Sequence, residues 1–171
     1  LIANQHCRSE CLFGPWHYML GEADVFDKDL FLKKSSLNKK IYGPVIFCLE
    51  SCASPSGLIR LPFIRPEDIG YYVKNGYADV FKLVNRSWPS NILKKVFQAY
   101  FTRKHRGDLF DIINAEKYGG STSCDNAGFP AGFAERVLTC DKTCESCSYC
   151  ENVAKRLIRQ RDTSLPPQDW D

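Results

Sequence analysis

Eight of the nine cysteines stand in groups whose spacing suits metal ligation, and they are the residues of this chain best able to do chemistry. Thiolate sulfur binds zinc and iron–sulfur clusters, and a shell of four ligands usually draws on short cysteine pairs that the fold brings together. The densest group places four cysteines within eleven residues: Cys140, Cys144, Cys147 and Cys150. The sequence therefore predicts a metal site here, with an apolar helix face lined by cysteines as the alternative.

Four earlier cysteines make a second candidate ligand set: Cys7, Cys11, Cys48 and Cys52. Cysteines at positions i and i+4 of a helical turn place both sulfurs on one side. Either pair alone could be two buried thiols, whereas both pairs together supply four ligands. Spacing does not distinguish an iron–sulfur cluster from zinc, and a structural zinc knuckle is the alternative for the later set. Cys124 stands apart in a segment rich in glycine and serine, and we expect a free thiol there.

Three cations are candidates for binding an anion. Residues 79–86 are expected to form a buried strand, on which Lys82 and Arg86 share a face because they lie four residues apart. Arg65 ends an earlier predicted strand. If the strands are parallel, their carboxyl ends meet, and these side chains would form a pocket suited to a carboxylate. The alternative is structural, with Arg65 paired to an acid two or three residues later and Lys82 in an ion pair of its own.

The elements that would position these residues alternate between strand and helix. Apolar runs predict a strand over 45–49 and, after a break at 54–57, an irregular strand over 58–65. A helix should open at Pro66, and a second helix follows the strand at 79–86. This order indicates an α/β fold with parallel strands. The other expected segments are the second helix itself at 91–102, a short helix at 108–114, a linker at 118–132, an amphipathic helix around 153–158 and a frayed tail at 163–171.

Length and composition limit the class of protein. The chain has 171 residues, 13% of them aromatic, which is enough for one domain with a core. Its net charge of +3 is too small to indicate nucleic-acid binding by itself. An odd number of cysteines in tight groups argues against a secreted disulfide scaffold and favours a reducing, cytoplasmic setting. No apolar run reaches the length needed to span a bilayer, so no membrane partner is expected. The start at Leu1 and the single methionine suggest a fragment of a longer protein.

One stretch resembles a known family. Residues 65–69 (Arg-Pro-Glu-Asp-Ile), then Gly76, then the run 79–86 and a helix ending in Ala99-Tyr100 are similar to the end of the barrel in the collagenase-like family U peptidases. Asn85 stands where that family has glycine. The resemblance implies that residues 1–115 are the C-terminal portion of a (β/α)8, TIM-like barrel. Residues 116–139 would then be a linker, and 140–171 a small Cys-rich, metal-binding helical tail.

The same resemblance implies a cofactor and a chemistry. Family members carry a Cys-ligated four-iron four-sulfur (4Fe-4S) cluster, and several take part in oxygen-independent hydroxylation of ubiquinone precursors or tRNA uridine, with prephenate as the implied oxygen donor. A prephenate-like anionic small molecule would meet Arg65, Lys82 and Arg86 at the barrel mouth. Cys7 and Cys11 lie in a comparable place to the family's ligands. The remaining N-terminal half of the barrel would belong to the same or a longer chain.

Three functions compete. The leading hypothesis is an iron–sulfur barrel enzyme that hydroxylates or modifies RNA or a small aromatic substrate without oxygen. The first alternative is a metal-stabilised module whose basic segments 94–106 and 155–161 bind RNA. The second alternative is a peptidase, for which the only histidine bases, His6, His17 and His105, stand in no recognisable nucleophile motif. The sequence assigns no catalytic residue and leaves open whether the chain is an enzyme.

Overall fold

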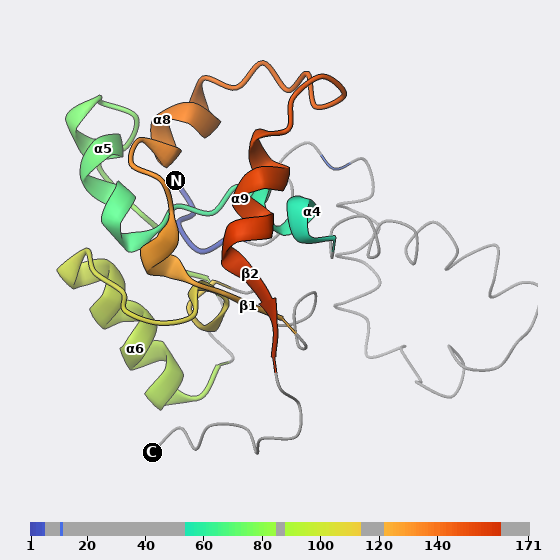
Figure 1. Ribbon diagram of the computed structural model, residues 1–171. Coiled ribbons are helices and arrows are strands. Elements are labelled where there is room, and N and C mark those ends of the chain that lie inside the picture. The colour runs from blue at the N-terminus through green and yellow to red at the C-terminus, as the bar shows by residue number, and fades with distance from the viewer. Residues whose placement is uncertain (6–10, 12–53, 85–87, 114–121, 162–171) are drawn as a thin grey trace, which may run out of the picture.

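A computed structural model describes residues 1–5, 11, 54–84, 88–113 and 122–161 of the chain. Figure 1 shows short helices arranged around a small central region, with strands β1 and β2 beside helix α9. The helices are α4 (Pro55–Ile59), α5 (Ile69–Lys74), α6 (Ser90–Thr102), α8 (Phe133–Leu138) and α9 (Tyr149–Leu157). Single 3-10 turns lie at Pro66–Asp68, Leu109–Asp111 and Asn126–Gly128.

The strands β1 (Thr122–Cys124) and β2 (Ile158–Gln160) pair antiparallel. Within the stretches that the structure describes, they form the one named sheet. The portion of a barrel expected over 1–115 therefore remains a prediction, and the strand expected at 45–49 lies outside the described residues. None of the described helices is long and apolar enough to cross a lipid bilayer.

Helix α4 lies where the sequence predicted a break followed by an irregular strand. Ser54 caps it, because the Ser54 hydroxyl accepts a hydrogen bond of 3.1 Å from the Gly57 N–H, and proline occupies the first helical position. Leu58 and Ile59 are buried where α4 packs on α9. The strand prediction was wrong for these two residues, because a serine–proline pair that begins a helix has the same composition as a turn.

Two helices follow the sequence closely. The predicted helix at Pro66 appears as a 3-10 turn that continues into α5 and ends at Asn75, followed by Gly76 in the left-handed region at φ 69°. The predicted helix at 91–102 appears as α6, which buries Val96, Ala99 and Tyr100. Phe97, in the middle of α6, is 62% exposed.

The N-terminal residues lie parallel to the run that was expected to form a buried strand. Leu1 N donates to Val80 O (2.9 Å), Lys82 N to Leu1 O (2.7 Å), and Ala3 N to Lys82 O (3.0 Å). On its other side, Ala3 O accepts from Ile64 N at 2.8 Å. Residues 1–4 are therefore held between two extended segments of the chain.

The burial expected for this strand was wrong. Val80 is 75% exposed and the Lys82 side chain is also exposed. Phe81 and Leu83 pack against the core, and because neighbouring side chains of an extended segment point to opposite sides, residue 82 faces solvent. The chain is extended here as predicted, but no cation is buried at Lys82.

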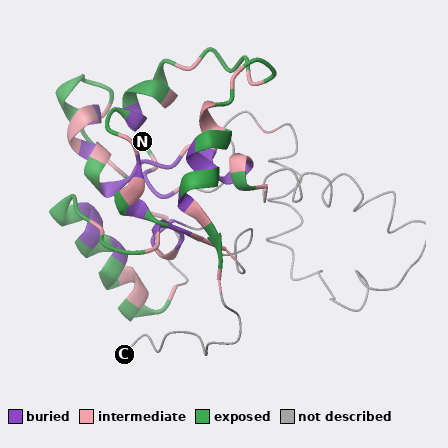
Figure 2. Ribbon diagram, in the orientation of Figure 1, coloured by how far each residue is buried: buried purple, intermediate pink, exposed green. Residues whose placement is uncertain are grey.

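The segment expected to be a linker contributes to the core. Cys124, Asn126, Phe129 and Phe133 are all buried, and Figure 2 shows buried residues gathered between the helices. The Phe63 ring lies 6.1 Å from the ring centroids of both Phe129 and Phe133. Residues 122–133 are therefore packed against the first part of the chain rather than spacing it from the second.

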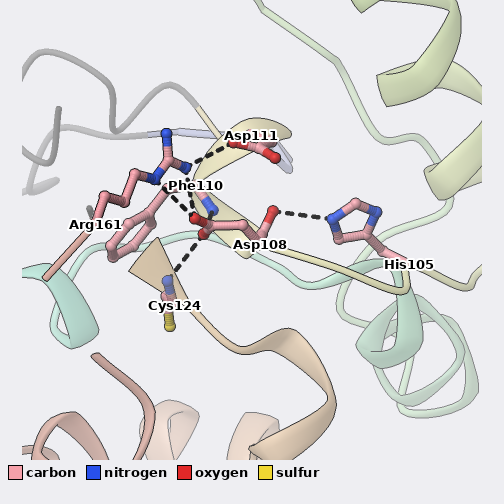
Figure 3. A network of polar contacts seen from close by, with 6 residues as sticks. All are labelled: His105, Asp108, Phe110, Asp111, Cys124 and Arg161. Carbon is pink, nitrogen blue, oxygen red and sulfur yellow. Dashed lines mark hydrogen bonds and ion pairs between the residues drawn. The ribbon is translucent and has the colours of Figure 1, made fainter. Parts of the chain in front are cut away.

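Asp108 joins three segments that are distant in sequence (Figure 3). Its Oδ1 accepts hydrogen bonds of 2.9 Å from the Phe110 N–H, within the 3-10 turn, and from the Cys124 N–H in β1. Its Oδ2 accepts from the guanidinium of Arg161, just after β2, which also donates to Asp111 at 2.7 Å. In the described part of the short helix expected at 108–114, which ends at residue 113, the structure has the single 3-10 turn Leu109–Asp111.

Substituting Asn4 by alanine should destabilise the fold by about 2–4 kcal/mol, because two polar groups of Val84 would lose their partner. Asn4 is fully buried; its Oδ1 accepts from Val84 N (2.8 Å) and its Nδ2 donates to Val84 O (3.3 Å). Urea unfolding measures the change. Asn152→Ala, on the exposed surface of α9, is the matched control and should change the free energy of unfolding by less than about 0.5 kcal/mol. Equal effects in both variants would contradict the pairing of residues 1–4 with 80–84.

Candidate metal centre

The four cysteines of the densest group lie on the connection from α8 to α9, which arches away from the core in Figure 1. All four are free thiols of intermediate exposure. Cys140 follows the end of α8, Cys144 and Cys147 lie on the connection, and Cys150 lies in the first turn of α9. A single short segment therefore carries the whole predicted ligand set.

The first sulfur of the group accepts a backbone hydrogen bond. Lys142 N donates to Cys140 Sγ at 3.4 Å, and Lys142 has a left-handed backbone with φ 63°. Asp141 Oδ1 holds the turn by accepting from the Thr143 N–H and hydroxyl at 3.1 and 2.8 Å, and Cys144 N donates to Lys142 O at 2.8 Å. The backbone N–H of Lys142 is therefore directed at the Cys140 sulfur.

Two arginines from other elements reach the later sulfurs. Arg136, in the last turn of α8, donates from Nη2 to Cys147 Sγ at 3.6 Å. Burial raises the pKa of the Cys150 thiol, and the positive charge of the Arg60 guanidinium acts in the opposite direction.

The group is not assembled as a closed ligand shell. Across the described ranges, no three His, Cys, Asp or Glu side chains are arranged closely enough to hold a metal ion. The donors nevertheless fit a thiolate-bound metal in kind, because four free thiols share one segment that also carries hydrogen-bond donors to sulfur. The metal prediction for this set remains a prediction.

The second predicted set is described only at Cys11, a residue of intermediate exposure. Cys7, Cys48 and Cys52 lie outside the described residues. Cys124 is free, as the sequence predicted, and fully buried. Burial, reinforced by Asp108 and Asp125, raises the pKa of its thiol to about 12, so Cys124 stays protonated at neutral pH.

Arg65 lies in a buried cluster. It is 8% exposed, and its Nε and Nη2 donate to the two carboxylate oxygens of Asp68 at 2.7 Å each. Its Nη1 donates to Asn126 O at 3.4 Å, and its guanidinium carbon lies 4.6 Å from the centre of the Phe129 ring. The contacts favour the structural alternative, an ion pair with a nearby acid, over an anion pocket at this residue.

Sequence reasoning missed a second polar cluster beside Arg65. Asn126 is buried, and its Nδ2 donates to Glu67 Oε2 (3.0 Å) and to His105 O (2.9 Å), while Glu67 Oε1 accepts from His105 N at 2.6 Å. From the sequence, the acids after Pro66 were considered as possible partners of Arg65, but not of Asn126 or His105. Nothing local in sequence signals that an asparagine 59 residues later completes the cluster.

Of the other two predicted anion-binding residues, the structure describes Lys82. Lys82 is exposed, whereas Arg65 is buried against Asp68, and Arg86 lies outside the described residues. The His105 ring also has a structural contact, because its Nε2 lies 2.9 Å from the Asp108 carbonyl oxygen rather than against a serine or cysteine. His6 and His17 are not among the described residues.

Comparison with known proteins finds a similarity to a protein that is named as a protease. No protein-family model matches the chain, and no solved structure matches it. The chain is similar to a protein named as an uncharacterized protease from Methanocaldococcus jannaschii, with 31% identity over 108 residues. The match covers 60% of this chain but only 30% of the relative, so the chain spans less than a third of that protein. The likeness agrees, at the level of that name, with the resemblance to collagenase-like peptidases.

Replacing Arg65 by methionine should destabilise the protein by about 3–5 kcal/mol, because the Asp68 carboxylate would be left largely buried without its partner. The double variant R65M/D68L should recover part of that loss in urea unfolding. Lys82→Met is the control: this side chain is exposed, so the change should stay below about 0.5 kcal/mol. If Arg65 served an anion pocket instead, R65M would keep its stability and lose affinity for a dicarboxylate.

Proposed function

We propose that this chain is a Cys-ligated metal protein related to the collagenase-like peptidases, with Cys140, Cys144, Cys147 and Cys150 as its ligands. The observation that carries the proposal is the pair of donors at the sulfurs, the Lys142 N–H at Cys140 and the Arg136 guanidinium at Cys147. Thiols that merely lined an apolar helix face would have no need of such donors, whereas metal-bound thiolates are stabilised by them.

The proposed architecture is the C-terminal portion of a (β/α)8 barrel followed by this metal-binding segment. The parallel pairing of residues 1–4 with 80–84 and the helices α5 and α6 on either side of that run support a parallel α/β arrangement. Because residues 122–133 pack into the core, the metal-binding segment would be held on the barrel portion through α9 and β2 rather than hanging from a linker.

The proposed activity is an oxygen-independent hydroxylation or related modification. When bound, an iron–sulfur cluster would supply one-electron transfer, whereas zinc would supply only structure or Lewis acidity. Lys82 and Arg86 remain the proposed residues for an anionic donor, since Arg65 is engaged by Asp68. Peptidase activity rests on the relative's name, and the contact of His105 with a carbonyl oxygen gives it no support.

Protein purified without oxygen should contain metal, and substituting any one ligand cysteine by serine should remove most of it, because a three-thiolate site binds more weakly. Elemental analysis measures the content, and broad absorbance near ~400 nm distinguishes an iron–sulfur cluster from zinc. Cys124→Ala is the matched control, because this thiol is buried and protonated, and should keep the full content. Metal that survives in all four serine variants would refute this ligand assignment.

A second candidate function, binding of single-stranded RNA, is favoured by the outer face of α6. Phe97 and Phe101 are 62% and 77% exposed, and their rings stack with centroids 5.8 Å apart. Lys94 lies three residues before Phe97 and so shares this face. Residues 80–107 contain seven lysines and arginines and no acid, although the whole chain has a net charge of only +3. Exposed aromatic rings among cations are what single-stranded nucleic acid binds.

The double variant F97A/F101A should lower the affinity for a single-stranded RNA oligonucleotide by about tenfold or more, because each stacked base contributes about 1–3 kcal/mol. Fluorescence anisotropy measures the affinity, which in the wild type should fall steeply with salt. Val73→Ala, an exposed apolar residue of α5, is the control and should bind as the wild type does. Undiminished binding in the double variant would remove α6 as the binding face.

A further inference from the structure

The loop that follows helix α6 carries the exposed cations Arg103, Lys104 and Arg106. They come directly after the exposed, stacked rings of Phe97 and Phe101. In the part of the chain that the structure describes, no acid forms an ion pair with any of these cations. Their charges are therefore available to an anionic partner.

Arg103 stands where the backbone favours glycine. Helix α6 ends in a Schellman motif, in which Lys104 N donates to Ala99 O at 3.0 Å and Arg103 N donates to Tyr100 O at 3.3 Å. The motif needs a residue in the left-handed region, and Arg103 occupies it with φ 55°. A residue with a Cβ is strained in this conformation, whereas glycine is not. Arginine at this position therefore lowers the stability of the fold relative to glycine.

Helix α5 shows the ordinary form of the same motif. Tyr77 N donates to Tyr72 O at 3.0 Å and Gly76 N donates to Val73 O at 3.1 Å, with Gly76 at φ 69°. The two helix ends thus differ in the residue at the left-handed position, and the end beside the exposed phenylalanines has arginine. Backbone strain of this kind persists mainly at functional positions, so the Arg103 side chain is a candidate for binding.

Hydrogen bonds fix the backbone of the rest of the loop. Glu67 Oε1 accepts from His105 N at 2.6 Å, and Asn126 Nδ2 donates to His105 O at 2.9 Å. The two acids beside the loop are engaged elsewhere, because Glu67 Oε2 accepts from Asn126 Nδ2 and Asp108 Oδ2 accepts from Arg161. A loop that is ordered before binding loses little conformational entropy when its cations meet a ligand.

We propose that Arg103, together with Lys104 and Arg106, binds the backbone phosphates of a single-stranded RNA whose bases stack on Phe97 and Phe101. The inference rests on the second candidate function and adds a phosphate subsite to the α6 face. The planar guanidinium of arginine can donate two parallel hydrogen bonds to one phosphate. Phosphate contacts and ring stacking carry no base code, so binding should depend little on RNA sequence.

A purely structural role for Arg103 makes a different prediction. Its Nη1 lies 3.7 Å from the position that a Cβ on Gly70 would take, so the side chain reaches α5. If covering α5 were its function, glycine at position 103 would lower the stability of the protein. If the side chain is kept for binding, glycine would raise stability and lower affinity, because it removes the strain and the charge together.

An anionic lipid surface also attracts aromatic rings among cations. Apart from Phe97 and Phe101, however, the exposed residues of α6 are polar. The helix therefore lacks the broad apolar face of a helix that lies in a membrane interface, and RNA is the partner that fits better.

The experiment measures RNA binding and thermal unfolding on the same variants. Fluorescence anisotropy follows a labelled single-stranded oligouridine over a range of salt concentrations. R103G should weaken binding by about tenfold, because a charge-assisted contact is lost, and should lower the slope of log affinity against log salt by about 0.7. It should also raise the melting temperature by about 2–4 °C, because the strain is relieved.

R103Q separates charge from strain. It removes the cation but keeps a Cβ in the left-handed region, so it should weaken binding as R103G does without raising the melting temperature. Lys74→Gln is the matched control, because it removes an exposed cation from the last turn of α5. Its affinity should stay within about twofold of the wild type, since salt screens a charge that does not touch the ligand.

The outcomes separate this inference from the function on which it rests. Wild-type protein that does not bind the oligonucleotide overturns both. Wild-type binding that R103G and R103Q retain overturns only the phosphate subsite. A lower melting temperature in R103G would assign Arg103 to structure, and an equal loss of affinity in K74Q would indicate general charge attraction; either result overturns the subsite. Binding to phosphatidylserine vesicles but not to RNA would identify a lipid partner and overturn both.

Discussion

The described part of this protein is organised around the buried guanidinium of Arg65. A buried arginine is tolerated only if its charge is paired and its donors are hydrogen-bonded. Arg65 meets both conditions with the Asp68 carboxylate, the Asn126 carbonyl and the face of the Phe129 ring. Asp68 precedes α5, whereas Asn126 and Phe129 belong to a segment some sixty residues later. The need to pair the buried Arg65 guanidinium therefore holds this later segment against the start of α5.

Asp108 extends this organisation to the far end of the described chain. Its carboxylate joins the turn after α6 to β1 through the Cys124 N–H and to the end of β2 through Arg161. Helix α9 runs directly into β2, so the pairing of β2 with β1 also fixes the helix that carries Cys150. The contacts of Asp108 with β1 and with the end of β2 thus hold the α9 end of the proposed metal-binding segment. The connection from α8 to α9 lies away from the core in Figure 1.

Local signals predicted the helices, and long-range contacts decided the rest. Pro66 signals the start of the helix and Asn75–Gly76 signals its end. Because both signals are local in sequence, α5 could be predicted. Ser54 and Pro55 were misread because the residues that cap a helix also make turns. The burial of Phe129 and Phe133 depends on Phe63 and Arg65, which no local composition reveals. Likewise, spacing identified the four cysteines as candidates, whereas only the structure shows that Arg136 of α8 donates to Cys147 Sγ.

The distribution of charge explains how the two proposed binding functions can occur in one chain. The stretch from 80 to 107 carries only cations, so the rest of the chain is net acidic, and the cysteine segment would become more negative on forming thiolates. Nucleic acid would repel such a segment if the two met. Figure 1 places α6 and the connection between α8 and α9 at different ends of the described part. Salt solution screens charges over about 10 Å, so the two proposals together expect nucleic acid on α6 and metal at the cysteine segment to bind independently of each other.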